Sequence, residues 1–151
     1  VSIVGMGAMG ILYGDFFANA LGREQVTFLA DSDRARRYRN TPVYCNGRKM
    51  DFRIQDGAVP DSQGPAQLLL FAVKATALGD AISVAGNQVG KDTVILSVLN
   101  GITSEAVIGE ALGMDHVLYC VSQGMDAVKL GNELTYSHMG QICIGIPEDQ
   151  A

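Results

Sequence analysis

The sequence has no apolar run long enough for a membrane helix. No stretch approaches the roughly 20 apolar residues that span a bilayer, and the N-terminus carries no charged region that leads into a signal peptide. Repeats and low-complexity tracts are absent as well. We therefore exclude a membrane partner and expect a soluble, cytoplasmic protein.

Cysteine is scarce in the chain. The three cysteines, Cys45, Cys120 and Cys143, are widely spaced, and no two form a CxxC pair. This odd number and spacing predict neither a metal site nor a disulfide framework. We expect all three to be buried as small hydrophobic side chains.

Basic residues are outnumbered by acidic ones. Eleven lysines and arginines stand against 16 aspartates and glutamates, so the formal net charge is −5. Because affinity for nucleic acid depends largely on phosphate neutralisation by lysine and arginine, we exclude nucleic acid as a partner. The one local exception is a basic cluster formed by Arg34, Arg36, Arg37 and Arg39.

The length and the two ends indicate one domain of a larger protein. The 151 residues, 48% of them hydrophobic, are enough for one globular domain with a sizeable core. Val1 already lies in a strand-like run, and Gly145–Ala151 is polar and marked by Pro147. We expect residues 1–146 to form the domain and residues 147–151 to begin a linker, with some catalytic groups outside the chain.

What the chain does contain is a strand, a glycine-rich turn and a helix in direct succession. Val1–Val4 leads into the turn and Ala8–Leu21 has helical apolar spacing. A dinucleotide pyrophosphate needs this order, because the free N–H groups and the positive dipole end of a helix N-terminus hold an anion. The turn comprises Gly5, Met6, Gly7, Ala8, Met9 and Gly10.

Each glycine of this turn has a distinct predicted task. Gly5 permits the tight turn, Gly7 lets the backbone approach the phosphates, and Gly10 lets the helix pack closely on the strand. A GxGxxG motif alone is a weak signal. Here a second strand, Val26–Ala30, ends at Asp31 at the spacing of a ribose-binding acid, so the context favours a nucleotide site.

The remaining pattern predicts alternating strands and helices. Continuous apolar runs at 68–73 and 93–99 are typical of strands buried on both faces of a parallel sheet. Helices are predicted at 75–89 and from Thr103 or Ser104 to Leu112.

Two further segments depart from this alternation. A basic helical turn capped by Ser32 or Asp33 precedes an Asn46-Gly47 hairpin between 43–45 and 50–54. Strand-like segments at 117–121, 133–138 and 141–146 then follow with little or no helix between them. We predict a Rossmann-type, doubly wound α/β fold with a mostly parallel sheet and an antiparallel C-terminal meander.

Ligands of open α/β sheets bind outside the carboxyl ends of the strands. The residues that follow the predicted strands are Gly5, Asp31, Lys74, Asn100 and the segment 122–127. We expect them to line one crevice.

Lys74 and Asn100 are the candidates for chemistry in this crevice. Lys74 follows six apolar residues, where a charge is costly unless it reaches water or an anion. It could equally extend to solvent as a strand-end lysine. The amide of Asn100 suits a nicotinamide carboxamide or a substrate carbonyl, although Asn100-Gly101 could simply form a turn.

The residues after the second strand do not decide whether the cofactor carries a 2′-phosphate. Asp31 could accept hydrogen bonds from both ribose hydroxyls of NAD and would repel a 2′-phosphate. Arg34, Arg36 and Arg37 could hold such a phosphate, or could form a solvated helical face. His116 and His138 have neither ligand spacing nor an obvious carboxylate partner, so we interpret both as structural.

With these residues assembled, the chain resembles the N-terminal domain of the ketopantoate reductase (2-dehydropantoate 2-reductase) family. The resemblance runs over nearly all residues and is carried by four groups: Gly5–Gly10, Phe71-Ala72-Val73-Lys74-Ala75, Leu99-Asn100-Gly101-Ile102, and Ser137-His138-Met139-Gly140 with Ile144-Gly145. The Val-Lys and Asn-Gly pairs at this separation are more specific than the glycine motif.

The resemblance implies an NADPH-dependent reduction of ketopantoate to pantoate, on the route to pantothenate and coenzyme A. It implies that Gly5–Gly10 bind the pyrophosphate, that Lys74 and Asn100 line the nicotinamide and substrate pocket, and that Ala127 sits against the cofactor. The family's general acid is a lysine of a following helical domain, which this chain lacks and through which a homodimer could form. The chain alone should bind cofactor yet turn over little.

The choice of cofactor and the choice among three functions stay open. NADPH-using members commonly place an arginine where this chain has Asp31, so NAD(H) stays open beside NADP(H), with Arg34 or Arg36 as substitutes for that arginine. The rivals are a reductase of another keto or hydroxy acid and a non-catalytic NAD(P)-sensing module.

Overall fold

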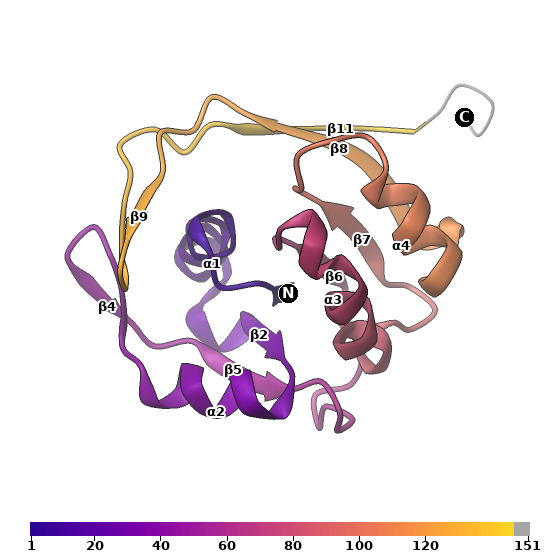
Figure 1. The fold of residues 1–151 in the computed structure, drawn as a ribbon, viewed down its shortest axis with the longest axis horizontal. Coiled ribbons are helices and arrows are strands. Elements are labelled where there is room, and N and C mark those ends of the chain that lie inside the picture. The colour runs from indigo at the N-terminus through magenta and orange to yellow at the C-terminus, as the bar shows by residue number, and fades with distance from the viewer. Residues whose placement is uncertain (147–151) are drawn as a thin grey trace.

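The computed structural model describes residues 1–146. The linker expected at 147–151 lies outside the described residues. Within this part of the chain the elements form two sheets and four α-helices (Figure 1). The helices are α1 (Ala8–Leu21), α2 (Ser32–Asn40), α3 (Leu78–Ala85) and α4 (Ser104–Leu112).

The central sheet has seven strands in the order β11-β8-β7-β6-β1-β2-β5. All neighbouring pairs are parallel except β11 and β8, which are antiparallel. The predicted Rossmann-type α/β class is therefore confirmed. In chain order the strands are β1 (Ser2–Val4), β2 (Thr27–Ala30), β5 (Arg53–Asp56), β6 (Leu68–Phe71), β7 (Val94–Ser97), β8 (Val117–Gln123) and β11 (Gln141–Gly145).

Alternation along the strands separates two cores. Val4 and Phe71 face α3 and α4 in one cluster, whereas the adjacent residues Ile3 and Leu70 pack toward Tyr13 of α1 on the other side of the sheet. Successive strand side chains point to opposite faces, so a continuous apolar run fills both cores.

A smaller second sheet covers the outer side of α1. Its strands are β4 (Arg48–Met50), β3 (Val43–Cys45), β10 (Glu133–Thr135) and β9 (Val128–Leu130), in that spatial order. Ile11 and Leu12 of α1 pack against Cys45 and Leu134 of this sheet. Helix α1 thus lies between two sheets, and Figure 1 shows it enclosed by the central strands and β4 and β9.

The hairpin was predicted correctly at its turn but not in its second strand. Asn46 and Gly47 have φ values of 48° and 77°, as a two-residue type I′ turn requires. The second strand is Arg48–Met50, and the expected segment 50–54 divides because Arg53–Asp56 crosses to the central sheet and pairs parallel to β2.

Three other local expectations need correction. Asp31, rather than Ser32 or Asp33, caps α2, since its carboxylate accepts the backbone N–H of Arg34 at 2.8 Å. The helix expected at 75–89 is divided into α3 and a 3₁₀ turn at each end. Strand β9 was not predicted. It pairs with β10 in the second sheet, whereas β8 and β11 belong to the central sheet, so the C-terminal strands are divided between the two sheets.

The cysteine expectation holds for one residue only. Cys45 is fully buried between α1 and the second sheet, but Cys120 is half-buried and Cys143 is exposed. Cys143 lies opposite Val121 on β11, the edge strand of the central sheet, where its side chain is exposed. None of the helices in residues 1–146 combines the length and apolarity needed to cross a bilayer.

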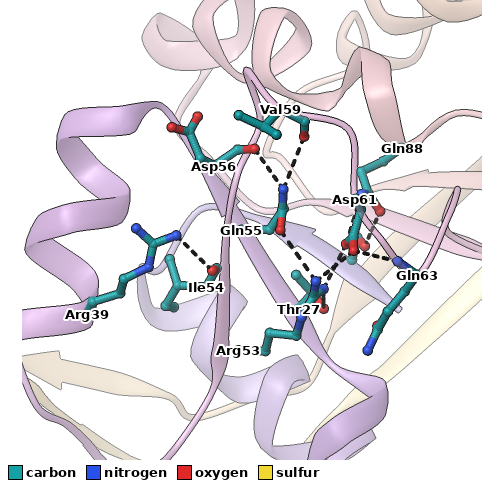
Figure 2. A network of polar contacts seen from close by, with 11 residues as sticks. Thr27, Arg39, Arg53, Ile54, Gln55, Asp56, Val59, Asp61, Gln63 and Gln88 are labelled. Atoms are coloured by element: carbon teal, nitrogen blue, oxygen red, sulfur yellow. Dashed lines mark hydrogen bonds and ion pairs between the residues drawn. The ribbon is translucent and has the colours of Figure 1, made fainter.

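A polar network holds β5 at the amino end of the sheet (Figure 2). Arg53 donates to both carboxylate oxygens of Asp61, at 2.7 and 2.6 Å, and also to Thr27. Gln88, which is buried, donates to Asp61 and accepts from Ser2. The network ties β1, β2, β5 and the turn after α3 together.

This network predicts a loss of stability in acid. The bond from Arg53 is the main cause that lowers the pKa of Asp61 from 3.8 to about 2. A lowered folded-state pKa stabilises the protein above the unfolded value, and this contribution is lost as the pH falls from 3.8 through about 2. Urea unfolding should show that Asp61 contributes about 1–2 kcal/mol at pH 7 that disappears near pH 2.

The matched comparison is Asp61→Asn against Asp92→Asn, which alters an exposed aspartate in the loop before β7. Asp61→Asn should lower stability at pH 7 and flatten its dependence on pH in this window. Wild-type and Asp61→Asn profiles that run parallel would contradict the assignment.

Candidate functional site

A cleft of about 760 Å³ opens at the carboxyl ends of β1, β2, β6 and β7. Its walls come from the glycine turn and the start of α1, from α2, from the segment after β6, and from the loop after β7. The predicted site residues that line it are Gly5, Gly7, Ala8, Met9, Asp31, Arg34, Lys74 and Asn100. The predicted crevice is thus a single cavity of the structure.

Gly5 lies where the chain turns against the end of β6. Its φ of +104° disfavours L side chains, and a Cβ would overlap the carbonyl oxygen of Ala72 and lie 2.8 Å from its carbonyl carbon. The glycine therefore allows both the turn and the close packing of β1 on β6.

Gly7 is the N-cap of α1 and faces open space. A Cβ at this position would meet nothing within 4 Å, and no side chain caps the helix. The first helical bond runs from the N–H of Ile11 to the carbonyl of Gly7, at 3.0 Å. The backbone N–H groups before Ile11 are therefore available to an anion in the cleft.

Three predicted cofactor residues do not line the cleft. Gly10 is buried, and a Cβ there would overlap the carbonyl oxygen of Gly5, which agrees with a packing role. Met6 and Ala127 pack among the apolar side chains between α1 and the second sheet. A direct contact of these residues with cofactor stays a prediction.

Lys74 and Asn100 are both exposed and face the same cleft from neighbouring strands. Within residues 1–146 neither side chain makes a hydrogen bond or ion pair, so each can bind a ligand without breaking an internal contact. Positive charge and an amide therefore lie at one end of the cleft, while the α1 N-terminus lies beside them.

Asp31 and Arg34 form the opposite wall. The second oxygen of Asp31 lies 3.4 Å from the Arg34 guanidinium, and both side chains are partly exposed. Arg36 instead pairs with Asp33 at 3.7 Å and is 74% exposed, outside the lining. Of the three arginines proposed for a 2′-phosphate, Arg34, Arg36 and Arg37, only Arg34 lines the cleft.

Sequence reasoning did not identify Tyr38, Thr76 and Asp80, which also line the cleft. Tyr38 could have been found, because it follows Arg34 by four residues and so shares its face of α2. Asp80 lies on α3, and its position depends on a chain path that no local pattern gives.

His138 does have a carboxylate partner, contrary to expectation. Its Nδ1 lies 3.0 Å from Asp126, which also accepts the backbone N–H groups of Ser137 and His138. The backbone N–H of His138 is the main cause that lowers the pKa of Asp126 to about 2. These contacts join the loops after β8 and β10, which supports a structural interpretation of His138.

Residues of the segment 122–127 close the cleft on the β8 side. Ser122 and Met125 contribute to its lining. The hydroxyl of Ser122 is hydrogen-bonded to that of Tyr13 on α1. This hydrogen bond connects β8 with the helix that carries the glycine turn. Burial of the Tyr13 side chain raises its pKa.

The residues present fit a nicotinamide dinucleotide. The open α1 N-terminus suits a pyrophosphate, the absence of a Cβ at Gly7 permits its approach, and Asp31 lies where a ribose would follow. The class of protein that the fold and the site define is a Rossmann-type α/β domain with a cleft that fits a dinucleotide.

The chain belongs to the ketopantoate reductase PanE/ApbA family, whose model matches residues 1–149. Members of this family are NAD(P)-dependent oxidoreductases. A search of curated proteins finds no match.

Several solved structures share this fold. A 2-dehydropantoate 2-reductase from Geobacter metallireducens GS-15 is 22% identical with a TM-score of 0.73, over 96% of this chain and 49% of that one. A D-mandelate dehydrogenase with NADH and anilino(oxo)acetate is 19% identical, TM-score 0.72, over 94% and 47%. A dimeric ketopantoate reductase from Staphylococcus aureus is 18% identical, TM-score 0.71, over 99% and 52%. The chain thus spans about half the length of each.

Proposed function

We propose that the chain is the cofactor-binding part of a reductase of small 2-keto acids, and that the reaction is the reduction of 2-dehydropantoate to pantoate. The observation that carries this proposal is the shared cleft: the open N-terminus of α1, Lys74 and Asn100 all face it. This arrangement provides an anion site beside a cation and an amide, as a dinucleotide and a keto acid require.

Different residues of the chain would bind the cofactor and orient the substrate. Backbone N–H groups at the start of α1 would hold the pyrophosphate of a nicotinamide dinucleotide, which would supply the hydride when bound. Asn100 donates to the substrate carbonyl and fixes its orientation, and Lys74 offers positive charge to the developing alkoxide or the substrate carboxylate. The proton comes from a lysine outside this chain, in a helical domain that the family resemblance implies.

The wider setting follows from the same proposal. The product would feed pantothenate and coenzyme A biosynthesis, and a cytoplasmic homodimer is the proposed form. A dimer is supported by the similar protein from Staphylococcus aureus, which is described as dimeric.

A reductase of another 2-keto acid is the second candidate. It is favoured by the fold shared with a D-mandelate dehydrogenase that binds NADH and anilino(oxo)acetate. A panel of keto acids assayed with the full-length protein separates the two. A clear preference for an aryl keto acid over 2-dehydropantoate would overturn the leading reaction.

Asn100→Ala tests the catalytic assignment in the full-length protein. We expect kcat to fall about 100-fold, because a donor to the reacting carbonyl is lost. The Kd for the dinucleotide, measured by nicotinamide fluorescence, should change less than about threefold.

The control is Ile102→Ala, since Ile102 is 91% exposed in the same loop and does not line the cleft. This variant should retain wild-type kcat. Equal losses in kcat and in dinucleotide affinity for Asn100→Ala would remove its role in the chemical step.

A further inference from the structure

The structure contains features that favour one of the two dinucleotides, NAD(H) or its 2′-phosphorylated form NADP(H). This inference rests on the proposed function. We propose that the Asp31–Arg34 pair makes the end of the cleft that binds adenosine accept a ribose with a free 2′-hydroxyl. The chain then takes NAD(H) in preference to NADP(H).

The first support is the position of the Asp31 carboxylate. Asp31 directly follows β2, the strand next to the one that carries the glycine turn, and it lines the cleft together with Arg34 and Tyr38. In a Rossmann-type domain this position faces the adenosine ribose, and an acid there accepts from the ribose hydroxyls.

The second support is that this carboxylate is held in place. One oxygen accepts the N–H of Arg34 at 2.8 Å as the cap of α2. Turning the side chain away from the cleft would leave the helix N-terminus without its cap. A carboxylate has further lone pairs, so the fixed group can still accept from a ribose hydroxyl.

The third support is the charge balance around the pair. Arg34 lies 3.4 Å from the second oxygen of Asp31, so the charge of this guanidinium is already matched. The other arginines of α2 do not line the cleft, and Arg36 is paired with Asp33. A 2′-phosphate would bring up to about two further negative charges against Asp31, and among the described residues that line the cleft there is no unpaired arginine to receive them.

Lys74 does not change this balance at the adenosine end. It follows β6, on the other side of β1 from β2, and so extends from the opposite wall of the cleft. Asp80, which lines the cleft from α3, adds negative rather than positive charge.

The test measures Kd values of the chain for NADH and NADPH by the fluorescence of their common nicotinamide. ADP-ribose and its 2′-phosphorylated form serve as probes without nicotinamide. We expect the unphosphorylated member of each pair to bind about tenfold more tightly.

Asp31→Ser is the decisive variant, because serine caps a helix as well as aspartate does but carries no charge. It should weaken NADH, strengthen NADPH and bring the two Kd values to parity or beyond. Adding Arg34→Gln should remove the gain for NADPH. Asp33→Ser, which removes the same charge from the first turn of α2 outside the cleft, should leave the ratio unchanged.

Tighter binding of NADPH by the wild type, or a ratio that Asp31→Ser does not move, would overturn this inference while leaving the reductase proposal intact. Failure of both dinucleotides and both ADP-ribose probes to bind would overturn the reductase proposal itself. The two failures are therefore distinguishable in one set of titrations.

Discussion

Replacement of Gly10 by alanine is expected to destabilise the domain by about 3 kcal/mol or more. The added Cβ would overlap the carbonyl oxygen of Gly5 and lie 3.0 Å from its carbonyl carbon, and both are backbone atoms that cannot rotate away. Helix α1 would have to move off β1, yet it is packed between two sheets. Thermal unfolding should show a Tm lower by about 6–12 °C.

Gly7→Ala is the matched comparison within the same motif. A Cβ at Gly7 meets nothing within 4 Å, and its backbone, with φ −85° and ψ −166°, is open to alanine. Stability should stay within about 1 kcal/mol of wild type. The methyl group would project into the path of the pyrophosphate, so dinucleotide affinity should fall at least about tenfold.

Together these variants separate folding from binding. A Gly10→Ala protein with wild-type stability would show that the close approach of α1 to the glycine turn is not required. A Gly7→Ala protein that binds dinucleotide normally would contradict the assignment of the α1 N-terminus as the anion site.

The cleft was predictable because its residues obey a rule that sequence alone can apply. Gly5, Asp31, Lys74 and Asn100 each follow an apolar run of strand length, and the carboxyl ends of parallel strands share one edge. Buried parallel strands are continuous apolar runs, so their ends are abrupt and easily located.

The path of residues 50–56 was not predictable in this way. A type I′ turn fixes the hairpin through local backbone conformation, and Asn46-Gly47 predicts it. Nothing local states that Arg53–Asp56 leaves the hairpin and pairs with β2. That pairing is stabilised by contacts of Arg53 with Thr27 and Asp61, which are distant in sequence from one another.

The cap of α2 shows a different kind of failure. Asp31, Ser32 and Asp33 are all good N-cap residues, so composition cannot choose among them. The choice depends on where β2 ends, because the cap needs extended backbone, and Asp31 has it with ψ 164°. One residue therefore serves as both the helix cap and a wall of the cleft.

The second sheet is the part of the fold that sequence reasoning described least well, and Asp15 holds it to α1. Asp15 is 1% exposed, and its oxygens accept from Arg48 at 2.9 Å and from the hydroxyl of Tyr136 at 2.7 Å. Burial, with Asp15 as the next cause, raises the pKa of Tyr136 to about 12 and that of Cys45 to about 11. Hence strands β3 and β4 and the end of β10 meet at one buried carboxylate on the helix.

Asp15→Ala should cost about 2–3 kcal/mol in urea unfolding. The Tyr136 hydroxyl would be left without its partner, while Arg48, whose side chain is 59% exposed, could be hydrated and so limits the loss. The separate loss from Tyr136→Phe should not add fully to that of Asp15→Ala, because both variants remove the same bond.

The rate of thiol labelling at Cys45 reports whether the second sheet has loosened from α1. In a Cys120→Ser, Cys143→Ser background Cys45 is the remaining thiol, and it is fully buried against α1. Asp15→Ala should raise its labelling rate under native conditions by more than tenfold, since each 1.4 kcal/mol lost from local opening raises exposure about tenfold. Two results together would contradict this role of Asp15: stability losses of Asp15→Ala and Tyr136→Phe that add fully in the double variant, and a Cys45 labelling rate that Asp15→Ala does not change. They would show that the second sheet is held instead by its apolar contacts with Ile11 and Leu12.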